Sequence, residues 1–227
     1  MRVLIIEDSV EVAEAISLCL QLRWPEVNLT IAAEGIRGIA ELESELFDIV
    51  LLDLNLPDID GFEVLKRVRS FSNVPIIIVT VRGEEEDQAK GLEMGADDYI
   101  IKPFRPRDLV ARVNSMLRRS SVSEVTEESQ SIIRGKLILR LAYNEVQFGK
   151  EIVKLTPLEA ELLYILMKNA EHTLSNEKIK QEIWRGDFEA TDLVRTYIRR
   201  LRDKLKDKPP QIILNQRGVG YIFVSPM

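Results

Sequence analysis

The chain has 227 residues and a formal net charge of −6, with 45% apolar and 30% charged residues. This length favours two domains of about 100–200 residues, and the composition is typical of a soluble globular protein. No apolar run approaches the roughly 18–20 residues of a membrane span, and the acidic pair Glu7-Asp8 comes too early for a signal peptide. One cysteine and one histidine exclude a disulfide framework and an ordinary structural zinc site. We therefore expect a cytoplasmic protein with no membrane association.

The charge differs between the two halves of the chain. Residues 1–120 hold 14 basic and 22 acidic residues, whereas residues 130–227 hold 17 basic and 12 acidic residues. The segment between them is rich in serine and glutamate and has too few apolar residues to pack. We predict a domain at 1–119, a flexible linker at 120–131 and a second domain at 132–227. An acidic domain can bind a cation, and a basic domain can bind nucleic acid.

Short apolar runs alternate with helical patterns through the first half. The runs, which predict strands buried on both faces of a parallel sheet, are 3–6, 30–33, 49–52, 76–79 and 99–101. The helical patterns that follow them are 9–22, 36–46, 61–70, 84–94 and 106–119. Five such units predict an open α/β sheet with right-handed crossovers.

Polar side chains stand where four of these strands end. Glu7 and Asp8 follow the first strand, and Asp53 follows the third. Thr80 ends the fourth strand and Lys102 the fifth. Each of them alone is more often a helix cap or a solvated charge, but sites in open α/β sheets form at this edge. Three carboxylates there stay ionised only beside a cation, and oxygen ligands favour Mg²⁺. The set predicts a phosphoryl-transfer pocket in which Asp53 forms an aspartyl phosphate.

The sequence around these positions resembles a response-regulator receiver domain. The resemblance rests on Glu7-Asp8, on Asp53 within Leu-Leu-Asp-Leu-Asn-Leu-Pro, on Gly61 and Thr80, and on the segment 95–104. It covers residues 1–119 and implies a flavodoxin-like five-stranded parallel sheet in the order 2-1-3-4-5. It also implies that Asp53 accepts a phosphoryl group from the phosphohistidine of a sensor kinase.

The resemblance implies a Mg²⁺ site around the phosphoacceptor. Asp8 and Asp53 would bind the ion together with the backbone carbonyl of Asn55, and Glu7 would act through water. Lys102 would pair with a phosphoryl oxygen, and its peptide bond to Pro103 is expected to be cis.

The resemblance also implies a switch at the fourth and fifth strands. Thr80 would move to donate a hydrogen bond to the phosphoryl group, and Tyr99 would turn inward to fill the space. One departure from the family follows Thr80, because Val81 stands where a small residue is usual. We expect this valine to alter the lifetime of the phosphate.

Charged residues gather on the face that this switch would change. Charge alone is typical of a solvated surface, but in the OmpR/PhoB subfamily these positions resemble the salt-bridged interface of a two-fold dimer. We expect the pairs Lys90–Asp108 and Asp98–Arg112 to form across such a dimer. The predicted interface residues are Lys90, Asp97, Asp98, Asp108, Arg112 and Arg119.

The second half begins with short alternating runs over 132–155, which predict a small antiparallel sheet. Thr156 and Glu159 form a capping box around Pro157, the expected start of a helix. A second helix begins at Ser175, a third spans about 191–206, and a hairpin follows over 211–224.

The third helix carries a basic stripe. Arg195, Arg199 and Arg202 recur at helical spacing, although like charges at this spacing repel each other. Such a stripe is often only a solvated face. The hairpin with Arg217 at its tip favours DNA, because a helix can enter the major groove while a wing reaches the minor groove or the backbone.

Residues 155–163, 194–205 and 216–221 resemble the winged-helix DNA-binding domain of the OmpR/PhoB family. The resemblance covers about 132–225 and implies sequence-specific binding, with two domains head to tail on direct repeats of promoter DNA. By position, Arg195, Thr196 and Arg199 would approach bases. Arg200, Arg202 and Lys204 would approach phosphates, and Arg217 would lie in the wing. The loop 185–190 corresponds to one that can contact RNA polymerase in this family.

The sequence thus predicts a flavodoxin-like α/β receiver followed by an α+β winged helix-turn-helix domain. The expected function is a phosphorylation-controlled transcriptional regulator, active as a homodimer, rather than a turnover enzyme. One alternative is a DNA-binding regulator that needs no phosphorylation, which Val81 leaves open. The other is a Mg²⁺-dependent phosphohydrolase of the haloacid dehalogenase class. Those enzymes place a second aspartate two residues after the nucleophile, where this chain has Asn55, which does not shuttle protons.

Overall fold

The computed structural model describes residues 1–120, 131–184 and 193–226, with side chains for all of these except 118–120 and 184. The chain divides into two compact units, Met1–Arg118 and Arg119–Met227. Most of the predicted linker, 120–131, falls outside the described residues. Within the described ranges, no helix is long and apolar enough to cross a membrane.

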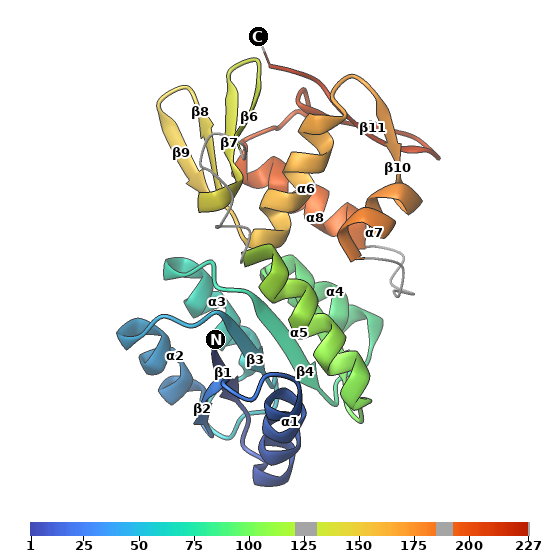
Figure 1. The fold of residues 1–227 in the computed structure, drawn as a ribbon. Helices are drawn as coiled ribbons and strands as arrows, with labels where there is room; N and C mark the ends of the chain where they lie inside the picture. The colour runs from blue at the N-terminus through green and yellow to red at the C-terminus, as the bar shows by residue number, and fades with distance from the viewer. Residues whose placement is uncertain (121–130, 185–192, 227) are drawn as a thin grey trace. The chain divides into compact units, whose positions relative to one another are not determined.

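The N-terminal unit alternates strands with helices, as the sequence predicts (Figure 1). Its strands are β1 (Arg2–Ile6), β2 (Asn28–Ala32), β3 (Ile49–Leu52), β4 (Ile76–Thr80) and β5 (Asp98–Ile101). Its helices are α1 (Val10–Arg23), α2 (Gly35–Ser44), α3 (Gly61–Phe71), α4 (Glu85–Met94) and α5 (Pro106–Ser120).

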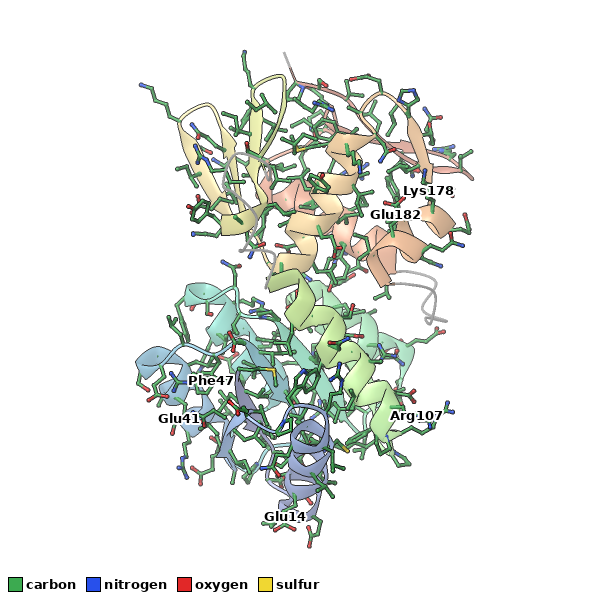
Figure 2. The ribbon with its side chains drawn as sticks, viewed as in Figure 1. Glu14, Glu41, Phe47, Arg107, Lys178 and Glu182 are labelled. Carbon is green, nitrogen blue, oxygen red and sulfur yellow. The ribbon has the colours of Figure 1, made fainter. Side chains whose placement is uncertain are left out.

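The five strands form one parallel sheet in the predicted order β2-β1-β3-β4-β5. Helices α1 and α5 cover one face, and α2, α3 and α4 cover the other (Figure 1). Both faces of the central strands are therefore buried, which explains their uninterrupted apolar runs. Charged side chains such as Glu14 and Arg107 point outward from the helices (Figure 2).

Side chains in the loops after two of the strands start the helices that follow. Ser9 caps α1, where its hydroxyl accepts a hydrogen bond from the Val12 amide. Asp60 caps α3 in the same way through the Phe62 amide, at 2.8 Å. Because such caps satisfy amides that have no partner within the helix, each helix starts at a fixed residue beside the edge of the sheet.

The C-terminal unit packs helices between two antiparallel sheets (Figure 1). The first sheet joins β6 (Ser131–Arg134), β7 (Leu137–Arg140), β8 (Glu145–Phe148) and β9 (Glu151–Lys154), with a 3-10 turn, η3 (Leu141–Tyr143), after β7. The helices are α6 (Pro157–Lys168), α7 (Asn176–Trp184) and α8 (Leu193–Lys204). The second sheet has the order β10-β12-β11, from β10 (Thr173–Ser175), β11 (Ile213–Gln216) and β12 (Gly220–Phe223).

The predicted sheet, three helices and hairpin of this unit are present, and β10 is an addition. It is only three residues long and its pairing partner, β12, lies far along the chain. The two hairpin strands, β11 and β12, lie within the predicted hairpin, 211–224.

A buried ionic cluster joins the start of α6 to α8. Glu159 completes the predicted capping box, since its carboxylate accepts from the Thr156 amide at 2.9 Å. The same carboxylate lies 2.7 Å from the Arg200 guanidinium and 2.7 Å from the Lys204 ammonium. Burial alone would raise the pKa of Glu159, but the two cations and the amide outweigh it and hold the pKa below the ordinary value of 4.5. Glu159 therefore stabilises the folded unit while it is ionised.

We predict that Glu159→Gln lowers the free energy of unfolding of the C-terminal unit by about 3–5 kcal/mol at pH 7, because Arg200 then lacks a buried counter-ion. Urea titration followed by the fluorescence of Trp184 measures this in a chain that carries Trp24→Phe, which leaves one tryptophan. The exposed carboxylate Glu182 on α7 gives the control, and Glu182→Gln is expected to change the free energy by less than about 0.5 kcal/mol.

The difference between parent and Glu159→Gln is expected to depend on pH. A carboxylate with a lowered folded-state pKa contributes its full stability above its unfolded pKa, and this contribution is lost as the pH falls through the folded value. The difference should therefore be constant near neutrality and shrink below the ordinary value of 4.5. A difference that stayed constant down to acid pH would contradict the ionic role of Glu159.

Candidate functional site

Three carboxylates converge at the carboxyl edge of the parallel sheet. Oxygen atoms of Glu7, Asp8 and Asp53 all lie within 4.8 Å of one another. The strand order makes β1 and β3 neighbours, and the Asp53 amide donates to the carbonyl of Ile6 at 2.9 Å. Glu7 and Asp53 are buried, with Asp53 only 5% exposed, whereas Asp8 is open to solvent. The predicted grouping of these acids is therefore present.

Lys102 neutralises part of this negative charge. Its ammonium lies 2.5 Å from a Glu7 oxygen and 2.7 Å from an Asp53 oxygen, and the Lys102 amide donates to the Thr80 carbonyl at 2.7 Å. Burial raises the pKa of Glu7, and the Lys102 ammonium opposes that shift without cancelling it. One ammonium among three carboxylates leaves an excess of negative charge. Hard oxygen donors with excess negative charge fit a divalent cation such as Mg²⁺.

The loop after Asp53 is held from both sides. The Asn55 amide donates to the Asp53 carboxylate at 3.2 Å. The Asp58 carboxylate accepts from the amides of Gly35 and Ile36, each at 2.8 Å, and so ties the loop to the start of α2. Burial would raise the pKa of Asp58, but these amides lower it overall. This anchor is not readable from local spacing, because the amides that Asp58 accepts from lie more than twenty residues earlier in the chain.

Arg82 bridges the loops that follow β3 and β4. Its guanidinium donates to the Asn55 side-chain oxygen at 2.7 Å and to Asp60 at 2.9 Å. Its backbone connects to both predicted switch residues. The Arg82 amide donates to the Thr80 hydroxyl at 3.4 Å, and the Arg82 carbonyl accepts from the Tyr99 hydroxyl at 2.7 Å. This bridge is not readable from the sequence, because nothing in the spacing brings residue 82 to residues 55 and 60.

Tyr99 already points into the protein in this structure. Its ring is already buried, at 7% exposure, and its hydroxyl is satisfied by the Arg82 carbonyl. Burial raises the pKa of Tyr99 far above its ordinary value, so the phenol stays protonated. Val81, between Thr80 and Arg82 in the chain, is largely exposed. The Lys102–Pro103 peptide bond is cis, as expected.

Two of the predicted dimer residues have partners inside their own unit. Asp97 is buried and lies 2.8 Å from the Arg69 guanidinium, with which it forms an ion pair inside the unit, and its interface role stays a prediction. Asp98 lies 2.6 Å from Arg112 within the same chain, where a pair across the dimer was expected. Both aspartates lie in or next to a buried strand, where a close ionic partner offsets the cost of burying a carboxylate.

The remaining predicted interface charges are more exposed. The Lys90 ammonium lies 4.1 Å from the centroid of the Phe62 ring. Asp108, in the first turn of α5, pairs at 3.2 Å with Arg105, which directly precedes the helix. The side chain of Arg119 lies outside the described residues.

The predicted DNA-binding residues of α8 and the wing fall into two groups. Arg195, Arg199 and Arg217 are exposed, as a contact with DNA requires. Thr196 and Arg200 are buried, and Arg200 is only 9% exposed because it pairs with Glu159. The roles of Thr196 at bases and of Arg200 at phosphates stay predictions, and in this structure neither side chain is exposed.

Two further residues predicted to contact phosphates, Arg202 and Lys204, have hydrogen-bond partners within the unit. Arg202 donates twice to the Ile213 carbonyl, at 3.0 and 2.6 Å. The ammonium of Lys204 lies against Glu159 and also donates to the Lys154 carbonyl at 3.1 Å. The loop that corresponds to a polymerase contact, 185–190, lies outside the described residues.

Comparison with known families identifies both units. Residues 3–114 match the family described as the response regulator receiver domain. Residues 149–223 match the family described as the C-terminal domain of transcriptional regulatory proteins.

Similar proteins match along nearly the whole chain. The regulatory protein VanRc of Enterococcus gallinarum is 35% identical, with 98% of each chain covered. The response regulator ArlR of Staphylococcus saprophyticus is 37% identical, with 97% of this chain and 98% of the relative covered. Among solved structures, a RitR mutant matches with a TM-score of 0.77 and 25% identity over 98% of both chains. DrrB of Thermotoga maritima, an OmpR/PhoB homologue, matches with a TM-score of 0.52 and 28% identity over 98% of both chains.

We predict that Gly61→Ala distorts the loop that carries Asp53. A Cβ atom at residue 61 would lie 2.4 Å from the Asp53 carbonyl oxygen and 2.6 Å from the Leu54 Cα, and backbone atoms cannot move aside as a side chain can. We expect the free energy of unfolding of the N-terminal unit to fall by about 1–3 kcal/mol. Thermal melting followed by Trp24 fluorescence in a Trp184→Phe chain measures this.

The control for Gly61→Ala is Gly83→Ala. A Cβ at residue 83 would meet only the side chain of Ile101, at 3.3 Å, and that side chain is exposed and can turn away. Equal destabilisation by the two substitutions would contradict the steric argument.

Proposed function

We propose, from the premise that the chain belongs to the OmpR/PhoB family of response regulators, that a phosphoryl group on Asp53 controls DNA binding by its C-terminal unit. One observation supports this most strongly. Asp53 is almost fully buried in a cluster of carboxylates that spans 4.8 Å, with the Lys102 ammonium 2.7 Å away. A nucleophilic carboxylate, a cation site and a fixed ammonium are the groups that phosphoryl transfer needs.

The covalent step is a displacement at phosphorus. A carboxylate oxygen of Asp53 attacks the phosphorus atom of a phosphohistidine on a sensor kinase, or of a small phosphodonor such as acetyl phosphate. The new O–P bond forms as the bond from phosphorus to the donor breaks, and the departing nitrogen or oxygen keeps the electron pair. The product is an aspartyl phosphate, which water later hydrolyses. The protein thus accepts and loses its own phosphoryl group and is not a turnover enzyme.

Glu7, Asp8, Asp53 and the Asn55 backbone carbonyl would hold Mg²⁺ in this pocket. When bound there, the ion would offset negative charge on the phosphoryl oxygens. Lys102 contributes a positive charge. Its ammonium now contacts Glu7 and Asp53, and it would move from these carboxylates to a phosphoryl oxygen. Asp58 holds the loop that presents Asn55.

Thr80, Arg82 and Tyr99 would carry the change to the surface. The phosphoryl group adds acceptor oxygens beside Thr80, whose hydroxyl now accepts from the Arg82 amide. When Thr80 donates to the phosphoryl group, the backbone of Arg82 moves with it. Because the Tyr99 hydroxyl donates to the Arg82 carbonyl, α4 and β5 respond to the same event.

The surface of α4 and α5 would then favour a homodimer. Pairing of two receiver units raises the effective concentration of two DNA-binding units joined by the linker 120–131. Their target would be direct repeats in double-stranded promoter DNA, with RNA polymerase as a further partner. A cytoplasmic location fits these partners.

Two alternatives are distinguishable from this proposal. A DNA-binding regulator independent of phosphorylation would bind its site equally well without the phosphodonor, and Val81 beside the pocket keeps this alternative open. A phosphohydrolase would turn over phosphate esters, but the residue two places after Asp53 is Asn55, whose side chain is held by Arg82 and does not titrate.

Phosphorylation is tested by the mass of the intact protein. After incubation with Mg²⁺ and acetyl phosphate, we expect the parent to gain one phosphoryl mass, and chelation of the metal should prevent the gain. Asp53→Asn keeps the shape of the site but lacks the nucleophile, and it should gain nothing. A gain that persisted in Asp53→Asn would place the modification elsewhere, and no gain from any donor or kinase would favour the phosphorylation-independent regulator.

Dimerisation is tested by light scattering with and without phosphodonor. We expect phosphorylation to double the molar mass of the parent but not of Asp108→Lys, which reverses a charge on the surface of α5. The fold should survive, because the exposed Asp108–Arg105 pair contributes only about 0–1 kcal/mol.

Glu14→Lys is the matched control for Asp108→Lys. It makes the same change on an exposed residue of α1, away from the proposed interface. If Glu14→Lys prevented the dimer and Asp108→Lys did not, the interface would lie on α1 instead.

A further inference from the structure

Helix α8 ends in a way that turns the next side chain into the protein. Lys206 has a φ of 55°, in the left-handed region. The Asp207 amide donates to the Arg202 carbonyl at 2.8 Å, and the Lys206 amide donates to the Asp203 carbonyl at 3.2 Å. These are the two hydrogen bonds of a Schellman motif. As a result, Asp207 is only 4% exposed although charged residues surround it in the sequence.

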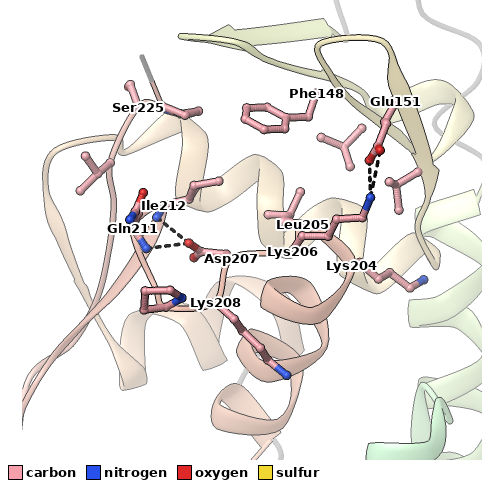
Figure 3. A pocket seen from close by; sticks show the side chains of 15 residues that line it. Phe148, Glu151, Lys204, Leu205, Lys206, Asp207, Lys208, Gln211, Ile212 and Ser225 are labelled. Carbon is pink, nitrogen blue, oxygen red and sulfur yellow. Dashed lines mark hydrogen bonds and ion pairs between the residues drawn. The ribbon is translucent and has the colours of Figure 1, made fainter.

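The Asp207 carboxylate accepts from three consecutive backbone amides. One oxygen accepts from Gln211 at 2.6 Å and from Ile212 at 3.0 Å, and the other accepts from Ile213 at 2.9 Å. Figure 3 shows the carboxylate between the amides of Gln211 and Ile212. Charge-assisted bonds of this kind are about twice as strong as neutral ones. The end of α8 is thereby fixed to the chain that leads into β11.

Arg202 holds the same point of the chain from the other side. Its guanidinium donates two hydrogen bonds to the Ile213 carbonyl, at 3.0 and 2.6 Å. Both backbone polar groups of Ile213, the first residue of β11, are thus bound by side chains from the end of α8. A strand held at both groups of one residue cannot slide or rotate there without breaking bonds to charged side chains.

Strand β11 runs from this point to the exposed tip of the wing. Its last residue, Gln216, precedes Arg217, and Arg217 and Arg199 are the exposed arginines of the wing and of the later part of α8. A wing fixed to α8 has the same position before and after DNA binding, so binding does not lose the entropy of ordering it. A wing that moved freely would lose that entropy on each contact.

We propose that Asp207 and Arg202 are positioning residues, which fix the wing relative to α8 so that Arg217 and Arg199 contact one DNA duplex together. Asp207 contacts no DNA itself, and Arg202 acts through Ile213 rather than on a phosphate. This inference rests on the proposed DNA binding by the C-terminal unit.

The charge of Asp207 gives the test an unambiguous direction. Asp207→Asn removes a negative charge, and charge alone would strengthen binding to the DNA polyanion. Loss of the wing contact weakens binding, by about fivefold at 0.15 M salt if one phosphate contact is lost. The probe is a DNA duplex that the full chain selects from a random library. Fluorescence anisotropy measures its affinity over a series of salt concentrations.

Asp203→Asn is the matched control. Asp203 lies in the last turn of α8, four residues before Asp207, and its exposed carboxylate pairs with Lys208. Asp203→Asn makes the same change in charge. We expect Asp203→Asn to bind equally or more tightly, whereas Asp207→Asn binds more weakly. The dependence of affinity on salt should also be shallower in Asp207→Asn, by about one unit of slope, although no basic residue has been removed.

Coupling to the wing separates positioning from general destabilisation. Arg217→Ala removes the wing contact, so adding Asp207→Asn to it should cost little further affinity. In the Arg199→Ala background the full loss should remain. Equal losses in the two backgrounds, or an affinity of Asp207→Asn at or above that of the parent, would overturn the proposal.

A second variant covers a failure of Asp207→Asn to fold, which circular dichroism would reveal. Arg202→Lys keeps the positive charge but cannot donate two hydrogen bonds to the Ile213 carbonyl. It should show the same weakening and the same dependence on Arg217, and parental affinity in this variant would count against the proposal. If the parent selects no duplex, DNA binding itself fails, and that outcome is distinct from a parent that binds and variants that do not differ.

Discussion

The repulsion between three carboxylates at one edge of the parallel sheet is the constraint on which the N-terminal unit depends. The strand order brings Glu7, Asp8 and Asp53 within 4.8 Å, and burial makes that proximity costly. Lys102, which follows β5, offsets part of this cost. Its ammonium reaches Glu7 and Asp53 because β5 pairs in register with β4, the strand beside β3. The remaining negative charge favours a divalent cation, and a phosphoryl group then becomes the natural partner of cation and ammonium. The chemistry of the unit therefore follows from an unfavourable interaction that the fold holds in place.

The C-terminal unit uses buried charge for a different purpose. Glu159 attracts Arg200 and Lys204 and so joins α8 to α6, while Arg202 and Asp207 join α8 to β11. Removing one partner from such a buried pair is far more damaging than removing an exposed pair. Helix α8, which carries the predicted DNA-contact arginines, is thus held by charged groups against both α6 and β11, and these arginines keep a fixed spacing.

Much of this architecture is readable in the sequence, and the limits have physical causes. Continuous apolar runs identify the central strands because both faces are buried, and the acids that end β1 and β3 must meet once the sheet order is known. The serine and threonine caps mark where α1 and α6 begin. Side-chain partners far along the chain are not readable in this way. The spacing of Arg200, Arg202 and Lys204 on α8 gives their direction around the helix, but an acidic partner on α6 or a carbonyl on β11 decides whether they face the interior. The same holds for Asp97, which has a charged neighbour in sequence and its ion-pair partner, Arg69, on α3.

The excess positive charge of the second half therefore has two separable consequences. Attraction at a distance depends on net charge, and an internal ion pair contributes nothing to it, since Arg200 and Glu159 cancel each other at the separation of a Debye length, about 8–10 Å. Contact with phosphates and bases depends instead on which basic side chains are exposed, and among those predicted these are Arg195, Arg199 and Arg217. In the proposed arrangement, the buried cations act on recognition indirectly, because a rigid spacing between exposed arginines restricts the duplex shapes that can satisfy all of them at once. Specificity would then depend on charges that do not contact DNA as well as on those that do.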